Sequence, residues 1–231
     1  MGNESAAKAA LDAINRDVVE CRACPRLVEW REQVARERRA AYRDEEYWGR
    51  PVPGFGDPAA RLLVVGLAPA AHGGNRTGRI FTGDRSGDFL FQAMWEAGFA
   101  SQPTSRHRDD GLELIDAYMT AAVRCAPPQN KPTVEERKTC EPYLLREWDA
   151  LEDIRAIVPL GSFAYAAVAR LTGWSGRPTF GHGVEGMLPN GATVICSYHP
   201  SQQNTFTGKL TPEMLANVFH RARATIKEKD A

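Results

Sequence analysis

The sequence lacks any long hydrophobic run. No stretch of about 18 apolar residues occurs in its 231 residues, so we expect no transmembrane helix. The first residues, Met1 to Ser5, have neither the basic segment nor the apolar stretch of a secretory signal. Cysteines that stay reduced are typical of the cytoplasm, and we expect the protein there. The length suits one large domain or two small ones, and 43% hydrophobic residues are enough for a sizeable core.

An excess of charge of either sign is also absent. The 29 Lys and Arg residues balance 29 Asp and Glu residues, so the formal net charge is zero. Bulk charge therefore gives no support for a nucleic-acid partner, and a DNA-binding surface would have to be a local patch. The arginine-rich segment from Arg31 to Arg43 is a candidate. Acidic residues are interspersed in it, so a solvated helix face is an equally good interpretation.

Several common catalytic signatures are missing too. There is no G-x-x-x-x-G-K-[ST] phosphate loop, no serine nucleophile elbow and no paired-carboxylate signature. These absences argue against a P-loop nucleotidase, a serine hydrolase of the nucleophile-elbow type and a two-carboxylate glycoside hydrolase.

Cysteine is scarce, but four of the five cysteines are arranged in two pairs. Cys21 and Cys24 form a C-x-x-C pair, and Cys125 and Cys140 follow with fourteen residues between them. Thiolates suit zinc and iron–sulfur clusters, and a structural zinc usually takes two tight pairs. The wide second pair favours an iron–sulfur cluster held by four cysteines, with zinc or ordinary buried thiols as alternatives. Cys196 stands in an apolar run and is interpreted as a core residue.

Apolar runs alternate with helical patterns along the chain. Strands are predicted at 61–66, 118–123, 155–160 and 193–197, and helices at 5–20, 88–97, from 133, at 162–171 and from 212. Alternation of this kind predicts an α/β fold, a three-layer α/β/α sandwich around a mostly parallel four-stranded sheet. In such sheets a ligand binds beyond the carboxyl ends of the strands.

Two long loops follow strands at that edge, over residues 66–87 and 197–210. Long loops without much secondary structure in a compact domain are usually functional. In the first loop, Asp84 stands where a helix begins, so it could cap that helix or orient a water molecule. In the second, His199 lies just past a strand end, a position that favours a functional role over a structural one.

The residues of these loops carry a resemblance. The segments GLAPAAHGGNRTGRIFTGDRSG and HPSQQNTFTGKL resemble the two active-site motifs of the uracil-DNA glycosylase superfamily. The four cysteines resemble those of its iron–sulfur branches, and G-L-A-P-A is similar to family 5 (type b) rather than to the G-E-A-P-G of family 4. The resemblance runs from Cys21 to about Leu210, and it implies a single domain over residues 1–231 with a 4Fe–4S cluster on Cys21, Cys24, Cys125 and Cys140.

The resemblance also implies roles for individual residues. Ala68 replaces the glutamate of family 4, so Asp84 is implicated in hydrolysis, while Phe81 matches the aromatic that stacks on the flipped base and His199 the histidine that faces it. Asn130 is the expected substitute for an asparagine that family 4 has at the position of Ala121. The catalytic set is thus Asp84, His199 and Asn130, and the remaining expected substrate contacts are Gly66, Ala68, His72, Gly74, Asn75, Phe81, Ser201, Gln203 and Asn204.

The implied activity is monofunctional DNA repair. A protein of this kind flips uracil, and other deaminated bases, out of DNA and hydrolyses the N-glycosidic bond to leave an abasic site. The expected partner is DNA that contains such bases, with the protein acting as a monomer and away from membranes. Three alternatives are a superfamily glycosylase with another preferred base, a non-catalytic iron–sulfur nucleic-acid-binding module, and a zinc-stabilised small-molecule hydrolase. Ala68 keeps the second alternative open, whereas Asp84 and His199 argue against it.

Overall fold

A computed structural model describes residues 2–229. Within these residues a single six-stranded sheet has the order β1-β3-β2-β4-β6-β5. Its four central strands are parallel: β3 (Ala117–Ala121), β2 (Leu62–Gly66), β4 (Ala156–Pro159) and β6 (Thr193–Ile195). These confirm the four predicted strands. Two short antiparallel edge strands, β1 (Phe55–Gly56) and β5 (Glu185–Met187), were not predicted and widen the sheet from four strands to six.

The central strands form because their residues are apolar on both sides. Every residue of β2, β3 and β4 is buried, as expected of parallel strands covered by helices on both faces. Gly66 pairs with Ala121 and Val65 with Pro159, so the carboxyl ends of these strands lie at one edge of the sheet. The loops that carry both sequence motifs leave from this edge.

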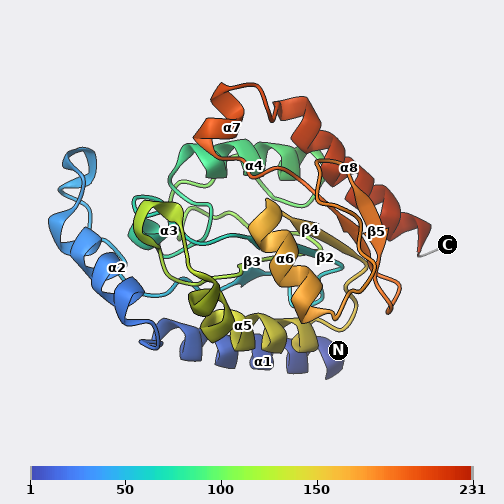
Figure 1. Cartoon of the computed structure of the whole chain (residues 1–231), viewed down its shortest axis with the longest axis horizontal. Helices are drawn as coiled ribbons and strands as arrows, with labels where there is room; N and C mark the ends of the chain where they lie inside the picture. Colours follow the sequence, from blue (N-terminus) through green and yellow to red (C-terminus); the bar gives the residue numbers. More distant parts are fainter. Residues whose placement is uncertain (1, 230–231) are drawn as a thin grey trace.

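Two helices, α4 (Arg85–Glu96) and α8 (Pro212–Glu228), cover one face of the sheet (Figure 1). Leu62 and Val64 point toward this side and share a core with Phe91 of α4 and Phe219 of α8. Each such side chain contributes about 1.5–3 kcal/mol when it is fully buried. Pro212 occupies the first turn of α8, and the preceding Thr211 caps the helix through its hydroxyl, as the sequence predicts.

Three helices cover the opposite face: α1 (Gly2–Val19), α5 (Val134–Ala150) and α6 (Ser162–Leu171). Leu63 and Val65 alternate with the residues above and point into this second core, where Cys196 is also buried. The interpretation of Cys196 as a core residue is therefore confirmed. Helices on both faces make the fold the expected three-layer α/β/α sandwich.

The remaining helices lie outside the two covering layers. They are α2 (Pro25–Glu37), α3 (Gly74–Thr77), α7 (Gln202–Phe206) and the 3-10 turns η1 (Ala40–Tyr42) and η2 (Pro128–Asn130). A capping box opens α5, as the sequence Thr133-Val134-Glu135-Glu136 predicts, with Glu136 N donating to Thr133 Oγ1 at 3.1 Å and Thr133 N to Glu136 Oε2 at 2.7 Å. Within residues 2–229, no helix combines the length and the apolar character needed to cross a membrane.

Candidate active site and cysteine pocket

The two motif loops meet at the carboxyl edge of the sheet. Phe81, from the loop after β2, and His199, from the loop after β6, have ring centroids 5.7 Å apart and planes inclined at 37°. The two loops follow β2 and β6, and in the sheet these strands are separated only by β4. A parallel bridge between Leu160, just after β4, and Ser197, just after β6, extends the pairing of β4 with β6. The parallel topology thus brings together two residues that are 118 positions apart in the chain.

Phe81 is held in an unusual backbone conformation. Its φ is 52°, in the left-handed region that residues with a Cβ rarely occupy, and its side chain is buried. The ring lies against the end of β2, where a Cβ on Gly66 would stand 2.7 Å from Phe81 Cε2. Strain of this kind persists only where the surroundings hold the residue firmly. Two buried arginines of the same loop provide that support.

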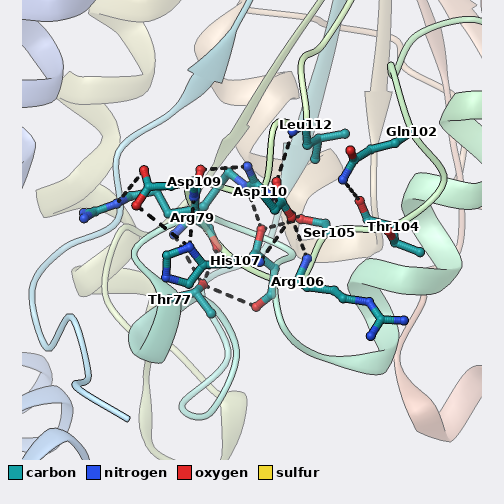
Figure 2. A network of polar contacts seen from close by, with 12 residues as sticks. Thr77, Arg79, Gln102, Thr104, Ser105, Arg106, His107, Asp109, Asp110 and Leu112 are labelled. Atoms are coloured by element: carbon teal, nitrogen blue, oxygen red, sulfur yellow. Dashed lines mark hydrogen bonds and ion pairs between the residues drawn. The ribbon is translucent and has the colours of Figure 1, made fainter.

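Arg79 clamps the loop to the segment that follows α4 (Figure 2). Its Nε donates to Thr82 Oγ1 at 2.9 Å, and its Nη2 donates to Ser105 Oγ at 2.9 Å and to Asp110 Oδ1 at 2.8 Å. Burial raises the pKa of Asp110, but hydrogen bonds from Arg79 and from backbone amides outweigh it and lower the pKa to about 2. Asp110 is therefore ionised at neutral pH, and it forms an ion pair with the buried Arg79 although its own side chain is partly exposed.

Arg76 closes the same loop on itself. Its Nε donates to the carbonyl of His72 at 2.9 Å and its Nη2 to the carbonyl of Gly83 at 2.7 Å. A further guanidinium nitrogen pairs with Glu45, and the cation lies 4.0 Å from the ring centroid of Tyr42. Both ends of the glycine-rich segment are thereby fixed. The sequence analysis assigned no role to Arg76 or Arg79.

Asp84 caps α4. Its Oδ1 accepts a hydrogen bond from Gly87 N at 2.9 Å, so the interpretation of Asp84 as a helix cap is confirmed. Its other oxygen lies over Gly73, where any side chain would collide with it. Burial raises the pKa of Asp84, against the lowering effect of hydrogen bonds from the amides of Gly87 and Ser86. A cap engages one oxygen firmly and leaves the carboxylate available for a second role.

His199 is neutral at physiological pH. Burial without a compensating negative charge lowers its pKa to about 4. Its carbonyl accepts a hydrogen bond from Asn204 Nδ2 at 2.8 Å, and Ser201 Oγ accepts one from Asn204 N at 3.4 Å as the cap of α7. Asn204 and Ser201 therefore shape the loop that carries His199. Gln203 is exposed on α7.

Other predicted contact residues occupy varied positions. His72 Nδ1 is hydrogen-bonded to Tyr47 Oη at 3.0 Å, and burial lowers the pKa of this histidine. Gly74 is the first residue of α3 and is buried. Asn75 is fully buried and its Nδ2 donates to the carbonyl of Arg31 at 3.1 Å, which favours structural support of α2 over contact with a substrate.

Asn130 and Ala68 differ in their surroundings. Asn130 is exposed in η2 with φ of 56°, and within residues 2–229 it makes no hydrogen bond to Asp84, Phe81 or His199. The catalytic role expected of Asn130 therefore stays a prediction. Ala68 packs against the small apolar cluster that contains Cys125, so the start of the first motif borders the cysteine region.

Basic side chains without carboxylate partners surround the two loops. Arg85, at the start of α4, lies with its guanidinium 5.2 Å from the ring centroid of Phe206, whose side chain is 66% exposed on α7. Lys209 Nζ lies 4.8 Å from the ring centroid of Tyr198. Arg106 is exposed, and Gly83 N donates to the carbonyl of the preceding residue, Ser105, at 2.8 Å. Among the described residues these three cations form no ion pair, so positive charge gathers here although the net charge is zero.

The four paired cysteines converge. Cys21 follows α1, Cys24 precedes α2, Cys125 follows β3, and Cys140 lies in the second turn of α5, yet all four line one pocket. All are free thiols. Within residues 2–229, no group of three or more His, Cys, Asp or Glu side chains is arranged to hold a single metal ion. In a 4Fe–4S cluster four cysteines surround a body much larger than one ion, so the donor set fits a cluster better than one zinc.

Charge at the pocket supports the same fit. Burial raises the pKa of Cys125 to about 11 and that of Cys140 to about 12, so both are neutral as free thiols. The guanidinium of the buried Arg31 nevertheless donates from Nη1 to Cys125 Sγ at 3.0 Å, and the backbone amide of Arg124 donates to Cys140 Sγ at 3.3 Å. In the part of the chain that the structure describes, Nε of Arg31 and both Nε and Nη1 of Arg124 have no hydrogen-bond partner. Buried cations near thiols are expected where the thiols are thiolate ligands.

Comparison with known proteins agrees with this site. The family model described as the uracil DNA glycosylase superfamily matches residues 53–223, the segment that holds both motif loops. A curated type-5 uracil-DNA glycosylase of Mycobacterium tuberculosis is 55% identical over 213 residues, which cover 91% of this chain and 80% of the relative.

Relatives from two other organisms separate the type-5 branch from the type-4 branch. The type-5 uracil-DNA glycosylase of Thermus thermophilus is 51% identical over 92% of this chain and 96% of the relative. A type-4 uracil-DNA glycosylase of Pyrobaculum aerophilum is only 29% identical, over 68% of this chain and 74% of the relative. The chain therefore belongs to the uracil DNA glycosylase superfamily, in its type-5 branch.

Proposed function

We propose that this protein is a DNA-repair glycosylase that flips uracil, and other deaminated bases, out of DNA and hydrolyses the N-glycosidic bond to leave an abasic site. It acts as a monomer in the cytoplasm. The observation that carries this proposal is the juxtaposition of Phe81 and a neutral His199 at the carboxyl edge of the sheet, where the loop that carries Phe81 also carries Asp84. The type-5 relatives support the same activity.

Base flipping costs a few kcal/mol, which contacts with the extruded base must offset. Phe81 offers a rigid aromatic face for stacking because Gly66 lies under its ring and the loop is clamped. Breaking the glycosidic bond leaves negative charge on the departing base. A neutral imidazole of His199 can donate a hydrogen bond to the base oxygen where that charge develops, an effect worth roughly 10²–10³ in rate.

Asp84 is proposed to serve the sugar side of the bond. As the bond breaks, the sugar becomes cationic, and a carboxylate beside it stabilises that charge and orients the attacking water. The cap from Gly87 N fixes the carboxyl group, so that its second oxygen is presented without rotation of the side chain. Ala68 has no polar group with which to activate water, which leaves this task to Asp84.

DNA is proposed to bind across the two loops. Arg85, Arg106 and Lys209 are exposed cations suited to phosphate contacts, and Phe206 is an exposed apolar side chain on the segment expected to enter the minor groove. A few contacts of this kind predict a modest salt dependence, with a slope of about −0.9 per phosphate contact.

Cys21, Cys24, Cys125 and Cys140 are proposed to hold a 4Fe–4S cluster. Such a cluster would supply a cross-link between the N-terminal helices and the segment from Cys125 to α5. Hydrolysis transfers no electrons between the reactants, so a structural contribution is sufficient for the proposed reaction.

The test is strand cleavage of a duplex that contains one uracil, followed by alkali. The purified protein should nick the uracil strand only after alkali, because a monofunctional glycosylase leaves an intact sugar–phosphate backbone. An identical duplex with thymine in place of uracil is the control. DNA binding without any cleavage by the wild-type protein would contradict the proposal and would favour a non-catalytic nucleic-acid-binding module.

A further inference from the structure

Arg31 is the most deeply buried arginine of the arginine-rich segment. Its side chain is 2% exposed, on the face of α2 that also buries Leu27, Val28 and Val34. Its Nη1 donates to Cys125 Sγ at 3.0 Å, and its Nη2 donates to the carbonyl of Cys21 at 3.1 Å. One guanidinium therefore contacts both of the chain segments that supply the paired cysteines.

The charge of Arg31 has no carboxylate partner among the described residues. The nearby Arg124 differs, since it forms a fully buried ion pair with Glu147, which in turn accepts from Thr120 Oγ1 at 2.7 Å. A buried charge without a counter-charge is strongly unfavourable. Arg31 Nη1 lies 3.0 Å from Cys125 Sγ, so thiolates bound to a cluster would supply the missing negative charge at hydrogen-bond distance. The geometry of Arg31 is thus explained by an anionic centre at the cysteine pocket.

Arg31 is also tied to the active-site loop through its backbone. Its carbonyl accepts from Asn75 Nδ2, and Asn75 is fully buried in α3, within the first motif. Asn75 in turn accepts a hydrogen bond from Gly49 N at its own carbonyl, at 3.0 Å. The position of α2 at Arg31 is therefore set from the loop that carries Phe81 and Asp84.

We propose that Arg31 is a positioning residue for the cysteine centre: it supplies the buried counter-charge for the thiolate-bound cluster and joins its two ligand segments. This inference rests on the proposed cluster. Outer partners of metal ligands typically contribute 10- to 100-fold to metal retention. Arg31 contributes a positive charge and two hydrogen bonds. A lysine keeps the charge and should therefore retain the cluster in part, whereas a methionine has neither and should not.

The experiment compares wild-type holoprotein with Arg31→Met, Arg31→Lys and the matched control Arg36→Met, an exposed arginine one and a half turns further along α2. Iron and acid-labile sulfide are measured in protein reconstituted without oxygen. The release of iron to a chelator is then followed by the loss of visible absorption. Arg31→Met should release iron about 10- to 100-fold faster than the wild type. Arg31→Lys should fall between them, and Arg36→Met should match the wild type.

The possible outcomes distinguish the proposed role of Arg31 from the proposed cluster and from the proposed uracil excision. Equal release by wild type and Arg31→Met would overturn it, and so would equal release by Arg31→Lys and Arg31→Met, which would show that charge has no part. If Arg31→Met does not fold, the comparison of Arg31→Lys with Arg36→Met decides, and equal rates overturn the inference. A wild-type protein that binds no iron and sulfide would overturn the cluster and this inference together, while leaving uracil excision to its own assay.

Discussion

Asp84 allows a sharp separation of structural and chemical roles. It caps α4 through Oδ1 and is also the proposed carboxylate of the reaction. Replacement by asparagine retains an oxygen for the cap, because Asn and Asp are comparable at this position of a helix. Replacement by alanine removes both the cap and the carboxylate. If Asp84 has the proposed role, the two variants should differ in thermal stability but lose the same catalytic carboxylate.

The expected sizes follow from the structure. Loss of a cap costs about 1 kcal/mol, which lowers the Tm of a chain of this length by roughly 2–4 °C. Burial raises the pKa of Asp84, so a neutral amide should be tolerated there without loss of stability. We expect Asp84→Asn to keep the wild-type Tm, and both variants to lose about 10²–10⁴ in the rate of uracil excision.

The assay is single-turnover excision at saturating enzyme, with Tm measured on the same preparations. Thr211→Ala is the matched control, because Thr211 Oγ1 caps α8 by accepting from Met214 N at 3.2 Å, on a helix outside the two motif loops. It should lower Tm about as much as Asp84→Ala and leave excision unchanged. A near-wild-type rate for Asp84→Asn would refute the catalytic role and leave Asp84 as a helix cap alone.

Four further predictions concern separate parts of the molecule. Arg79→Met should lower the free energy of unfolding in urea by about 2 kcal/mol, because the partly buried carboxylate of Asp110 loses a charged hydrogen-bond partner. Burial lowers the pKa of His199 to about 4, and the unfolded chain, with a value near 6.5, binds more protons between those pH values. From pH 7 to pH 5 the wild type should therefore lose about 2 kcal/mol more stability than His199→Gln, and equal losses would contradict the depressed pKa. Arg106→Gln should reduce the salt slope of DNA binding by about 0.9, whereas Lys8→Gln on α1 should not change it. Cys125→Ser should lose visible absorption and iron, and full retention would exclude Cys125 as a ligand.

The central strands were predictable because their environment is uniform. The run from Leu62 to Gly66 is buried on both faces, so its continuous apolar character is visible in the sequence alone. The edge strands were not predictable in this way. β1 has two residues and β5 three, and such short strands are defined by pairing with a neighbour rather than by any periodic pattern.

The candidate site was predictable where it depends on strand ends. The loops that carry Phe81 and His199 were expected at one edge because parallel strands share a carboxyl edge, and the family resemblance implied that both residues contact the flipped base. The clamp of Arg79 and Asp110 was missed, since the two residues are 31 positions apart and neither lies in a periodic segment. Arg31 was grouped with a surface patch, although its spacing of four from Leu27 and three from Val34 places it on the buried face of α2. That spacing is the signal that would have identified it.

The left-handed backbone of Phe81 has a consequence for how tightly a base can be held. A flexible aromatic side chain loses conformational freedom when a ligand orders it, and that loss weakens binding by about 0.5–1.5 kcal/mol per side chain. The ring of Phe81 is already fixed, by Gly66 beneath it and by the Arg79 clamp behind it. The entropy is therefore lost when the chain folds and not when the base arrives. A base that reaches this edge therefore contacts a Phe81 ring of fixed position. Selection among bases then depends on how well each base fits that rigid surface.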